Sequence, residues 1–296
     1  MYDVIIIGGG VAGLTSAIYL LRANKKVLII EKETIGGQIT SSPLVENYPG
    51  FLSISGMDIA DNLYNQVINL GADIELEEVL SLELETTIKK VVTDYNKYEA
   101  KVIIIATGAK YITTGVEDDY IGRGVNFCVA CDGAFYKDKE VAVIGGGNTA
   151  VINSIALADI AKKIYLITCD DFLTGEVKNI EKVNRLDNVD IMYNTKMTKV
   201  IGDNDVEKIE LSSLDKTTSL DVDGMFIAVG MKPNINLIKD KLKLDDRGYI
   251  LSSDSNTIYD GVFVAGDCRS KEVRQLTTAT SDGTIAATLA IKYLSK

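Results

Sequence analysis

The sequence predicts an α/β fold of two Rossmann-like nucleotide-binding domains, each a three-layer ββα arrangement, with the second inserted into the first. The chain twice carries a β-branched strand that runs into glycines, as DVIIIGGG at 3–10 and EVAVIGGG at 140–147. A helix-like stretch and another apolar strand follow each copy, so each is a strand–helix–strand unit of a parallel sheet. A last apolar strand and helix follow the second unit without a glycine motif, which predicts that they return to the first domain.

The elements follow in order along the chain. In the first unit we expect a helix at about 12–23 and a strand at 27–31, and in the second a helix at 149–161 and a strand at 164–168. Apolar strands at 101–108 and 225–230 close the two units, and the returning segment has a strand at 261–267 and a helix at about 277–294. Segments 77–98 and 196–219 are rich in Val, Ile and Thr and are expected to form antiparallel side sheets. The predicted domain ranges are 1–113 and 244–296 for the first domain and 114–243 for the second.

The composition excludes several classes of protein. The 296 residues are 46% hydrophobic and 25% charged, which is typical of a globular chain of about two domains. The net charge of −11 argues against binding to nucleic acid or to an anionic membrane surface. With no long apolar run and no basic leader, the expected location is the cytoplasm. The chain has no histidine, which excludes an imidazole base and a His-ligated metal.

The first glycine turn carries a dinucleotide fingerprint. Gly8, Gly10 and Gly13 follow a strand and open a helix, where the backbone can approach a pyrophosphate and the helix N-terminus faces it. Glu31 ends the next strand, 18 residues after Gly13, where a carboxylate accepts from a ribose hydroxyl.

The second turn, with Gly145, Gly147 and Ala150, has the same position between a strand and a helix, but the residues at the end of the next strand differ. An offset of 137 residues maps Glu31 onto Thr168, so the strand end lacks the carboxylate that would accept from a ribose hydroxyl. No arginine lies nearby to bind the extra phosphate of NADPH. This turn is either a working nucleotide site or only a vestige of the fold.

A pair of cysteines, Cys128 and Cys131, lies at an expected helix start, where two thiols can close and reopen a disulfide. A zinc site needs two more soft ligands, and Cys169 and Cys268 are isolated, so the alternatives are a redox pair or a structural pair. Asp132 is either a nearby proton donor or a helix N-cap. Cys169 and Cys268 each follow an apolar strand and are expected to be inert core thiols.

Over nearly its whole length the chain resembles the low-molecular-weight thioredoxin reductases. The pieces that carry the resemblance are GGGVAGL at 8–14, GGQ at 36–38, VENYPGF at 45–51, ATG at 106–108, GRGVNFCVACDGAF at 122–135, VAVIGGGNTAV at 141–151, GVFVAGD at 261–267 and RQLTTATSDG at 274–283.

The resemblance implies an FAD-dependent reductase of thioredoxin. FAD would be bound by the first glycine turn with Glu31 and by the other matching pieces, namely Gly37, Gln38, Asn47, Ala106, Thr107, Gly108, Gly266, Asp267, Arg274 and Gln275. It implies that Cys128 attacks the partner disulfide, that Cys131 faces the flavin, and that Asp132 donates a proton. It also implies a homodimer and a rotation between the domains that presents the thiols in turn to flavin and to thioredoxin.

The chain departs from the family pattern at the second turn. A His-Arg-Arg run and a later Arg usually hold the 2′-phosphate of NADPH, and here those places carry Thr168, Cys169, Asp170 and Thr174. A pair of glutamates that often follows the second fingerprint is replaced by Ile152 and Asn153. A branch of the family that takes electrons from ferredoxin has lost its pyridine-nucleotide motifs, so NADPH, NADH and ferredoxin all stay open as donors.

Two other functions stay open as well. The same cysteine pair would serve a flavoprotein that reduces another dithiol protein or a peroxide-reducing partner. A flavin-bound redox sensor that does not turn over is the third possibility, and the intact cysteine pair argues against it, since a sensor has no need of it.

Overall fold

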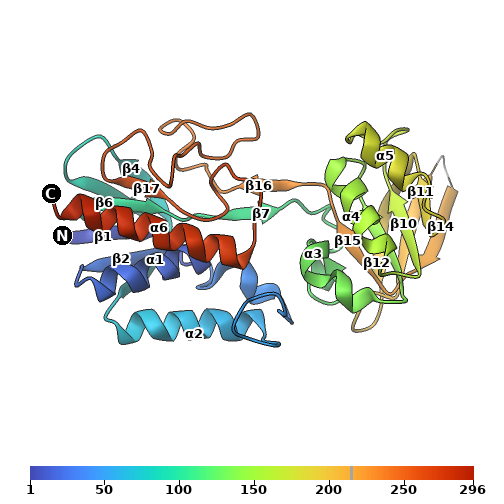
Figure 1. Cartoon of the computed structure of the whole chain (residues 1–296), viewed down its shortest axis with the longest axis horizontal. Coiled ribbons are helices and arrows are strands. Elements are labelled where there is room, and N and C mark those ends of the chain that lie inside the picture. The colour runs from blue at the N-terminus through green and yellow to red at the C-terminus, as the bar shows by residue number, and fades with distance from the viewer. Residues whose placement is uncertain (214–215) are drawn as a thin grey trace. The chain divides into compact units, whose positions relative to one another are not determined.

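A computed structural model describes residues 1–213 and 216–296, and it divides into two compact units (Figure 1). The first unit is discontinuous and comprises Met1–Lys110 and Lys232–Lys296, and the second is Tyr111–Met231. The chain passes between them in two short strands, β7 (Ala109–Tyr111) and β16 (Met231–Pro233), which pair with each other. Among the described residues, no helix has both the length and the apolarity that a bilayer crossing needs.

The sheet of the first unit has the strand order β3-β2-β1-β6-β5-β4, with β17 paired to β6. Its parallel part consists of β1 (Tyr2–Ile7), β2 (Val27–Glu31), β3 (Asp73–Leu76), the second half of β6 (Lys97–Ile105) and β17 (Val262–Val264). The centre of this part is buried on both faces, as expected for parallel strands made of continuous apolar runs.

Two clusters of apolar side chains cover the faces of this sheet. On one face α1 (Val11–Arg22) lies beside α6 (Leu276–Leu294), with α2 (Gly56–Asn69) next to α1 (Figure 1). On the other face β4 (Val79–Glu83) and β5 (Lys89–Thr93) pack with segment 235–250. The antiparallel pairing predicted for 77–98 is confirmed, but these strands extend the main sheet, because the first half of β6 pairs with β5.

The second unit has a five-stranded parallel sheet of order β11-β10-β9-β15-β8. Its strands are β8 (Val125–Asn126), β9 (Glu140–Ile144), β10 (Lys163–Ile167), β11 (Val189–Met192) and β15 (Gly224–Ile227). Helices α4 (Asn148–Ala158) and α5 (Val177–Val183) cover one face. The antiparallel sheet β12 (Thr195–Ile201), β13 (Lys208–Ser213) and β14 (Lys216–Asp221) covers the other, as predicted for 196–219. Short helices complete the chain: η1 (Gly37–Ser41), η2 (Asp118–Tyr120), α3 (Val129–Asp132) and η3 (Gly133–Tyr136).

The two glycine-bearing parallel units confirm the predicted fold class. The predicted helices and strands agree with the structure to within a few residues. The largest difference is at the strand predicted at 101–108, which is observed at Lys97–Ile105, and the strand predicted at 261–267 is reduced to Val262–Val264. The compact units end at Lys110 and Met231, where the sequence suggested 113 and 243. The second difference arises because Ile238 and Leu242 are buried in the core of the first unit with Ile250.

Candidate functional site

The first glycine turn is built from three glycines with different tasks. Gly8 has φ +107°, and a Cβ there would lie 2.3 Å from the carbonyl oxygen of Ala106. A Cβ on Gly13 would lie 2.0 Å from the carbonyl oxygen of Gly8, so both glycines are needed by the fold itself. A Cβ on Gly10 would meet only the carbonyl oxygen of Gly36, at 3.8 Å. The protein does not fill the space in front of Gly10, which is what a glycine facing a ligand requires.

Glu31 is fixed beside this turn by backbone donors. Its Oε2 accepts from the N–H of Gly9 at 2.7 Å, and its Oε1 accepts from the N–H groups of Lys32 at 2.9 Å and Glu33 at 2.8 Å. A carboxylate has about four lone-pair sites, so these three bonds leave room for a ribose hydroxyl. The structure therefore places Glu31 against the turn.

The GGQ and ATG pieces lie at the same end of the sheet. Gly36 pairs with Gly10 as an isolated bridge, and Gly37 and Gln38 begin η1. Thr107 and Asn234 form a reciprocal clamp, in which Thr107 Oγ1 donates to the carbonyl of Asn234 at 2.7 Å and Asn234 Nδ2 donates to the carbonyl of Thr107 at 2.9 Å. The N–H of Asn234 also donates to the carbonyl of Gly108 at 3.0 Å. Asn234 was not predicted, because a lone Asn in a loop carries no motif.

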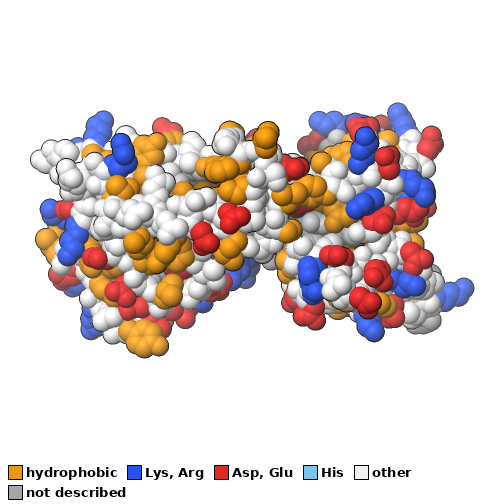
Figure 2. Space-filling model, turned by 90° about the horizontal axis from the view of Figure 1, so that it is seen from below, with side chains coloured by type: hydrophobic (Ala, Val, Ile, Leu, Met, Phe, Trp, Pro, Cys, Tyr) orange, Lys and Arg blue, Asp and Glu red, His pale blue; other side chains and the backbone are white. Residues whose placement is uncertain are grey.

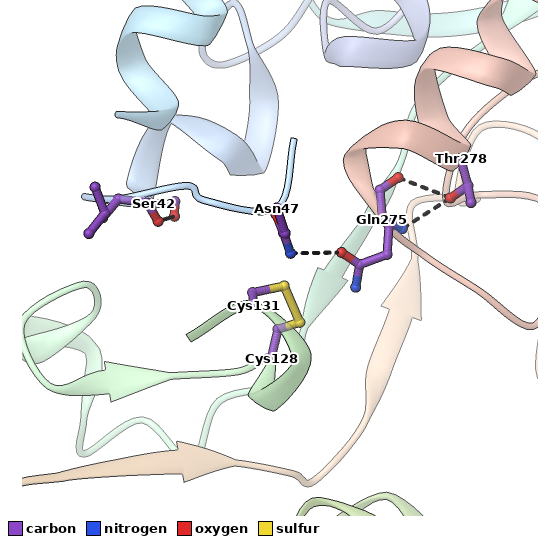
Figure 3. The surroundings of a disulfide bond; sticks show 7 residues. Ser42, Asn47, Cys128, Cys131, Gln275 and Thr278 are labelled. Atoms are coloured by element: carbon purple, nitrogen blue, oxygen red, sulfur yellow. Dashed lines mark hydrogen bonds between the residues drawn. A yellow bond between two sulfur atoms is a disulfide. The ribbon is translucent and has the colours of Figure 1, made fainter. Parts of the chain in front are cut away.

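Residues more than 200 positions apart meet at the start of α6. Asn47 Nδ2 donates to Gln275 Oε1 at 3.5 Å (Figure 3). Arg274 donates to the carbonyl of Asp267 at 3.3 Å, and its guanidinium lies 3.8 Å from the centre of the Tyr249 ring. The stacked Tyr249 was also missed, since nothing in the sequence links it to Arg274.

These residues fit a dinucleotide such as FAD. Helix α1 begins at Gly10, which has no side chain to cap the first N–H groups, and that end points into the open space before Gly10. The fixed carboxylate of Glu31 lies on one side of the turn, at the carboxyl ends of parallel strands where such ligands bind.

The second glycine turn repeats the backbone of the first. Gly145 has φ +141°, and a Cβ there would lie 2.6 Å from the carbonyl oxygen of Ala228. A Cβ on Gly147 would meet only Thr174 Oγ1, at 4.0 Å, and Gly147 pairs with Thr174 as Gly10 pairs with Gly36. Ala150 is fully buried in the third position.

The chemistry at the end of β10 differs from that at the end of β2. Thr168 is buried and its Oγ1 accepts from the N–H of Asp170 at 3.2 Å, in a tight turn. That turn brings Asp170 Oδ2 to 3.6 Å from where a Cβ on Gly146 would lie, whereas Glu31 Oε2 lies 3.4 Å from the same point at Gly9. The strand end thus has no acid, as predicted, but a carboxylate two residues later lies against the turn.

Cys128 and Cys131 form a disulfide with a Cα–Cα distance of 5.2 Å (Figure 3). Cys128 is the N-cap of the four-residue helix α3, and its carbonyl accepts from the N–H groups of Cys131 at 3.1 Å and Asp132 at 2.9 Å. Both cysteines are partly exposed. At one end of this segment Asn126 Nδ2 donates to the hydroxyl of Tyr136 at 2.7 Å, so a side-chain bond ties the segment's two ends together.

Asp132 follows the pair at once and is half-buried. Burial raises the pKa of its carboxyl to about 6, because the charged form loses its hydration. It occupies the N-cap position of η3, yet its side chain makes no capping hydrogen bond. A carboxyl group whose pKa lies near neutrality, directly after a cysteine pair in the sequence, is suited to carrying a proton.

The other two cysteines differ from each other. Cys268 is fully buried, its Sγ donates to the carbonyl of Ala265 at 3.4 Å, and burial raises its pKa to about 11, which makes it the inert core thiol that was predicted. Cys169 is exposed, so the same prediction is wrong for it. The reason is that β10 ends at Ile167, and the turn after it carries Cys169 out to the surface. In the described chain, no three or more acidic or cysteine side chains are grouped to hold a metal ion.

Comparisons with known proteins agree with this architecture. The family model described as pyridine nucleotide-disulphide oxidoreductase matches residues 2–283. A 34.2 kDa protein in the rubredoxin operon of Clostridium pasteurianum is 39% identical over 298 residues, covering 99% of this chain and 97% of that protein. Thioredoxin reductase of Treponema pallidum is 38% identical, with the same coverage. The crystal structure of thioredoxin reductase from Streptococcus pyogenes is 37% identical, with a TM-score of 0.96 over 100% of this chain and 98% of that one. The resemblance predicted from the motifs is confirmed.

Proposed function

Since this chain belongs to the pyridine nucleotide-disulphide oxidoreductases, we propose that it is an FAD-dependent thioredoxin reductase. The observation that carries the proposal is the Cys128–Cys131 disulfide at the start of α3, in a chain whose other unit has a complete dinucleotide turn. Relatives named thioredoxin reductase match it over nearly their whole length.

The first unit would bind FAD. Gly10 leaves room for the pyrophosphate, Gly8 and Gly13 shape the turn, and Glu31 accepts from the adenosine ribose. The remaining contacts would come from Gly37, Gln38, Asn47, Ala106, Thr107, Gly108, Gly266, Asp267, Arg274 and Gln275. When bound, FAD supplies a two-electron carrier that the amino-acid side chains lack.

The cysteine pair would perform the disulfide exchange. Two electrons and two protons convert the Cys128–Cys131 disulfide to two thiols. The Cys128 thiolate attacks one sulfur of the thioredoxin disulfide and forms a mixed disulfide, and the other thioredoxin sulfur leaves as a thiolate. Cys131 then attacks Cys128, which releases reduced thioredoxin and restores the intramolecular disulfide. Asp132 supplies a proton to the leaving thiolate, a task suited to a pKa of about 6.

The second turn bears on the choice of electron donor. We propose that NADPH is a poor donor, because residues 168–175 contain no Lys or Arg and Asp170 lies against Gly146. A reduced protein such as ferredoxin is the leading replacement, in which case Gly145, Gly147 and Ala150 are a vestige of the fold. NADH is the second candidate, favoured by the Asp170 carboxylate, which can accept from a ribose that carries no 2′-phosphate.

We also propose, from the family resemblance, that the enzyme is a homodimer and acts in the cytoplasm.

Turnover by cysteine variants tests this function. In Cys128→Ser and Cys131→Ser we expect thioredoxin reduction to disappear while FAD stays bound and a donor still reduces it. Cys131→Ser should also accumulate a mixed disulfide with thioredoxin through Cys128, detectable as a mass increase. Normal turnover in either variant would refute the relay.

The test also separates the alternatives. A wild-type protein that reduces a peroxide-reducing partner but not thioredoxin would be the other kind of dithiol reductase. A protein whose flavin is reduced while no disulfide partner turns over would be the redox sensor.

A further inference from the structure

The loop between β17 and α6 contains a group of buried charges that differs from the ion pairs elsewhere. Pairs such as Lys90–Glu83 and Lys32–Glu78 have side chains about half exposed, and charges of both signs are scattered over the face drawn in Figure 2. Such pairs contribute little, because water screens them. The side chains of Arg269 and Lys271 in the loop are 13% exposed, and that of Asp282 in α6 is 11% exposed.

Lys271 is at the centre of this group, and three oxygen atoms surround its ammonium group. Its Nζ lies 3.0 Å from Asp267 Oδ1, 3.0 Å from Asp282 Oδ2 and 3.3 Å from Thr278 Oγ1. The ammonium group donates hydrogen bonds to Asp282 Oδ2 and Thr278 Oγ1, whereas its contact with Asp267 Oδ1 is an ion pair without hydrogen-bond geometry. Thr278 and Asp282 belong to α6, and Asp267 belongs to the loop, so Lys271 joins the loop carboxylate to the helix.

Asp282 keeps the lysine in place. Its Oδ1 accepts from Arg269 Nη1 at 2.9 Å, and its Oδ2 accepts from the N–H of Gly266 at 3.1 Å as well as from Lys271. The whole residue Asp282, backbone included, is 7% exposed. A buried carboxylate that accepts from three donors has little freedom to move. The lysine therefore has a fixed anchor on one side and Asp267 on the other.

The ion pair selects one oxygen of Asp267. The Lys271 ammonium lies against the buried Oδ1, which accepts no hydrogen bond, so charge attraction holds this oxygen toward the lysine and leaves Oδ2 available for another donor. Without Lys271, the carboxylates of Asp267 and Asp282 would face each other with Arg269 as the remaining cation of this group, and their repulsion would turn Asp267 away.

We propose that Lys271, anchored by Asp282, is a positioning residue that orients the Asp267 carboxylate for the cofactor. This inference rests on the proposed function, in which Asp267 contacts FAD. It assigns Lys271 no contact with the cofactor, so its effect on binding must pass through Asp267.

A double-mutant cycle on FAD affinity tests this dependence. The dissociation constant is measured by the recovery of FAD fluorescence on release, in wild type, Asp267→Asn, Lys271→Met and the double variant. The strength of a hydrogen bond to a charged group predicts that each single substitution weakens FAD affinity by about tenfold to a hundredfold. In the Asp267→Asn background, Lys271→Met should change the constant by no more than about twofold.

Two controls separate positioning from general damage to the fold. Lys90→Met removes a half-exposed ion pair in the same unit and should leave FAD affinity unchanged. Thermal unfolding of the cofactor-free proteins shows whether each variant is folded, and Lys271→Gln, which can still donate to one carboxylate, replaces Lys271→Met if that variant does not fold.

The outcomes separate the positioning role of Lys271 from the assignment of an FAD contact to Asp267. Strong coupling between positions 267 and 271 supports it. Additive losses, with Lys271→Met equally harmful in both backgrounds, overturn the positioning role and leave the assignment of FAD to Asp267 intact. An unchanged FAD affinity in Asp267→Asn overturns both.

Discussion

The two glycine turns of this chain have nearly the same backbone and different chemistry. In each, the first glycine has a positive φ and lies close to the carbonyl oxygen of the residue that follows a neighbouring strand, and the second faces space that the protein leaves open. In each, the second glycine also pairs with the loop that follows the next strand, as Gly10 with Gly36 and Gly147 with Thr174. The turns differ in their third residue and in the side chains beside them.

These differences show which features serve the fold and which serve a ligand. Gly13 is required because α1 approaches Gly8 closely, whereas α4 accommodates the methyl group of Ala150 in the same position. Glu31 is fixed by three backbone donors at the first turn, and at the second the corresponding place is taken by Thr168, with Asp170 nearby. A fingerprint of glycines alone therefore reports the shape of a turn and not its occupant.

The largest effect is expected when the glycine that faces open space in each turn is replaced by valine. Gly10→Val should lower FAD affinity about a thousandfold, since two or more phosphate contacts of about 1.5–3 kcal/mol each would be lost. Gly147→Val should leave FAD affinity unchanged and, if the donor is a protein, should leave turnover unchanged too. Both residues have extended backbone angles that Val adopts freely, so both variants should fold.

FAD content after purification and thermal unfolding of the cofactor-free proteins check these two variants. Gly13→Val is the contrasting control, because its Cβ would meet Gly8 and should prevent folding itself. Full FAD occupancy in Gly10→Val would contradict the assignment of the first turn.

An intermediate effect is expected from restoring cations to the second turn. The double variant Cys169→Arg/Asp170→Arg should strengthen NADPH binding by about a hundredfold, because a guanidinium–phosphate contact is worth about 1.5–3 kcal/mol and a repulsive carboxylate is removed. NADH lacks the 2′-phosphate and should not gain. Titration calorimetry with both nucleotides measures this, and an equal gain for NADH would show that the difference between the turns does not lie in phosphate recognition.

The smallest effect concerns an ionisable group found in the second unit. The pKa of Asp132 is raised to about 6 by burial, above its ordinary value of 3.8, so ionisation of this group lowers the stability of the folded state as pH rises from 3.8 through 6. Asp132→Asn should therefore increase the free energy of unfolding at pH 8 by about 1–2 kcal/mol, after allowance for partial exposure, and should have no such effect at pH 3.5.

Urea unfolding at the two pH values measures this difference, and the rate of disulfide exchange should fall at the same time. A destabilised Asp132→Asn at pH 8 would mean that the ionised carboxylate is stabilised by a partner and does not carry a proton.

The regular elements were predictable because their signals are local. Strands such as β2, with the bounds Val27–Glu31, are apolar runs that end in a charged residue or in glycines, and those limits are visible in the sequence. The first glycine turn with Glu31 was predictable for the same reason. Asn234 and Tyr249 were not predictable, since their partners are distant in sequence. Lys271 lies near Asp267 and Asp282 in sequence, but nothing in the sequence shows that the three side chains are buried together. The position of Asp170 was not predictable from its distance along the chain to the strand end. The tight turn at Thr168 brings the Asp170 carboxylate back toward Gly146.

Reduction of the bound flavin under anaerobic conditions tests the contrast between the two turns most directly. Stopped-flow absorbance would follow the oxidised flavin after mixing with NADPH, NADH or reduced ferredoxin, with dithionite as the control that shows the flavin to be reducible. We predict that NADPH at micromolar concentrations reduces the flavin at least about a hundredfold more slowly than the preferred donor, because two or three phosphate–guanidinium contacts are absent. Rapid reduction by micromolar NADPH, followed by thioredoxin turnover, would contradict it and would show that the second turn binds NADPH without cations at the 2′-phosphate.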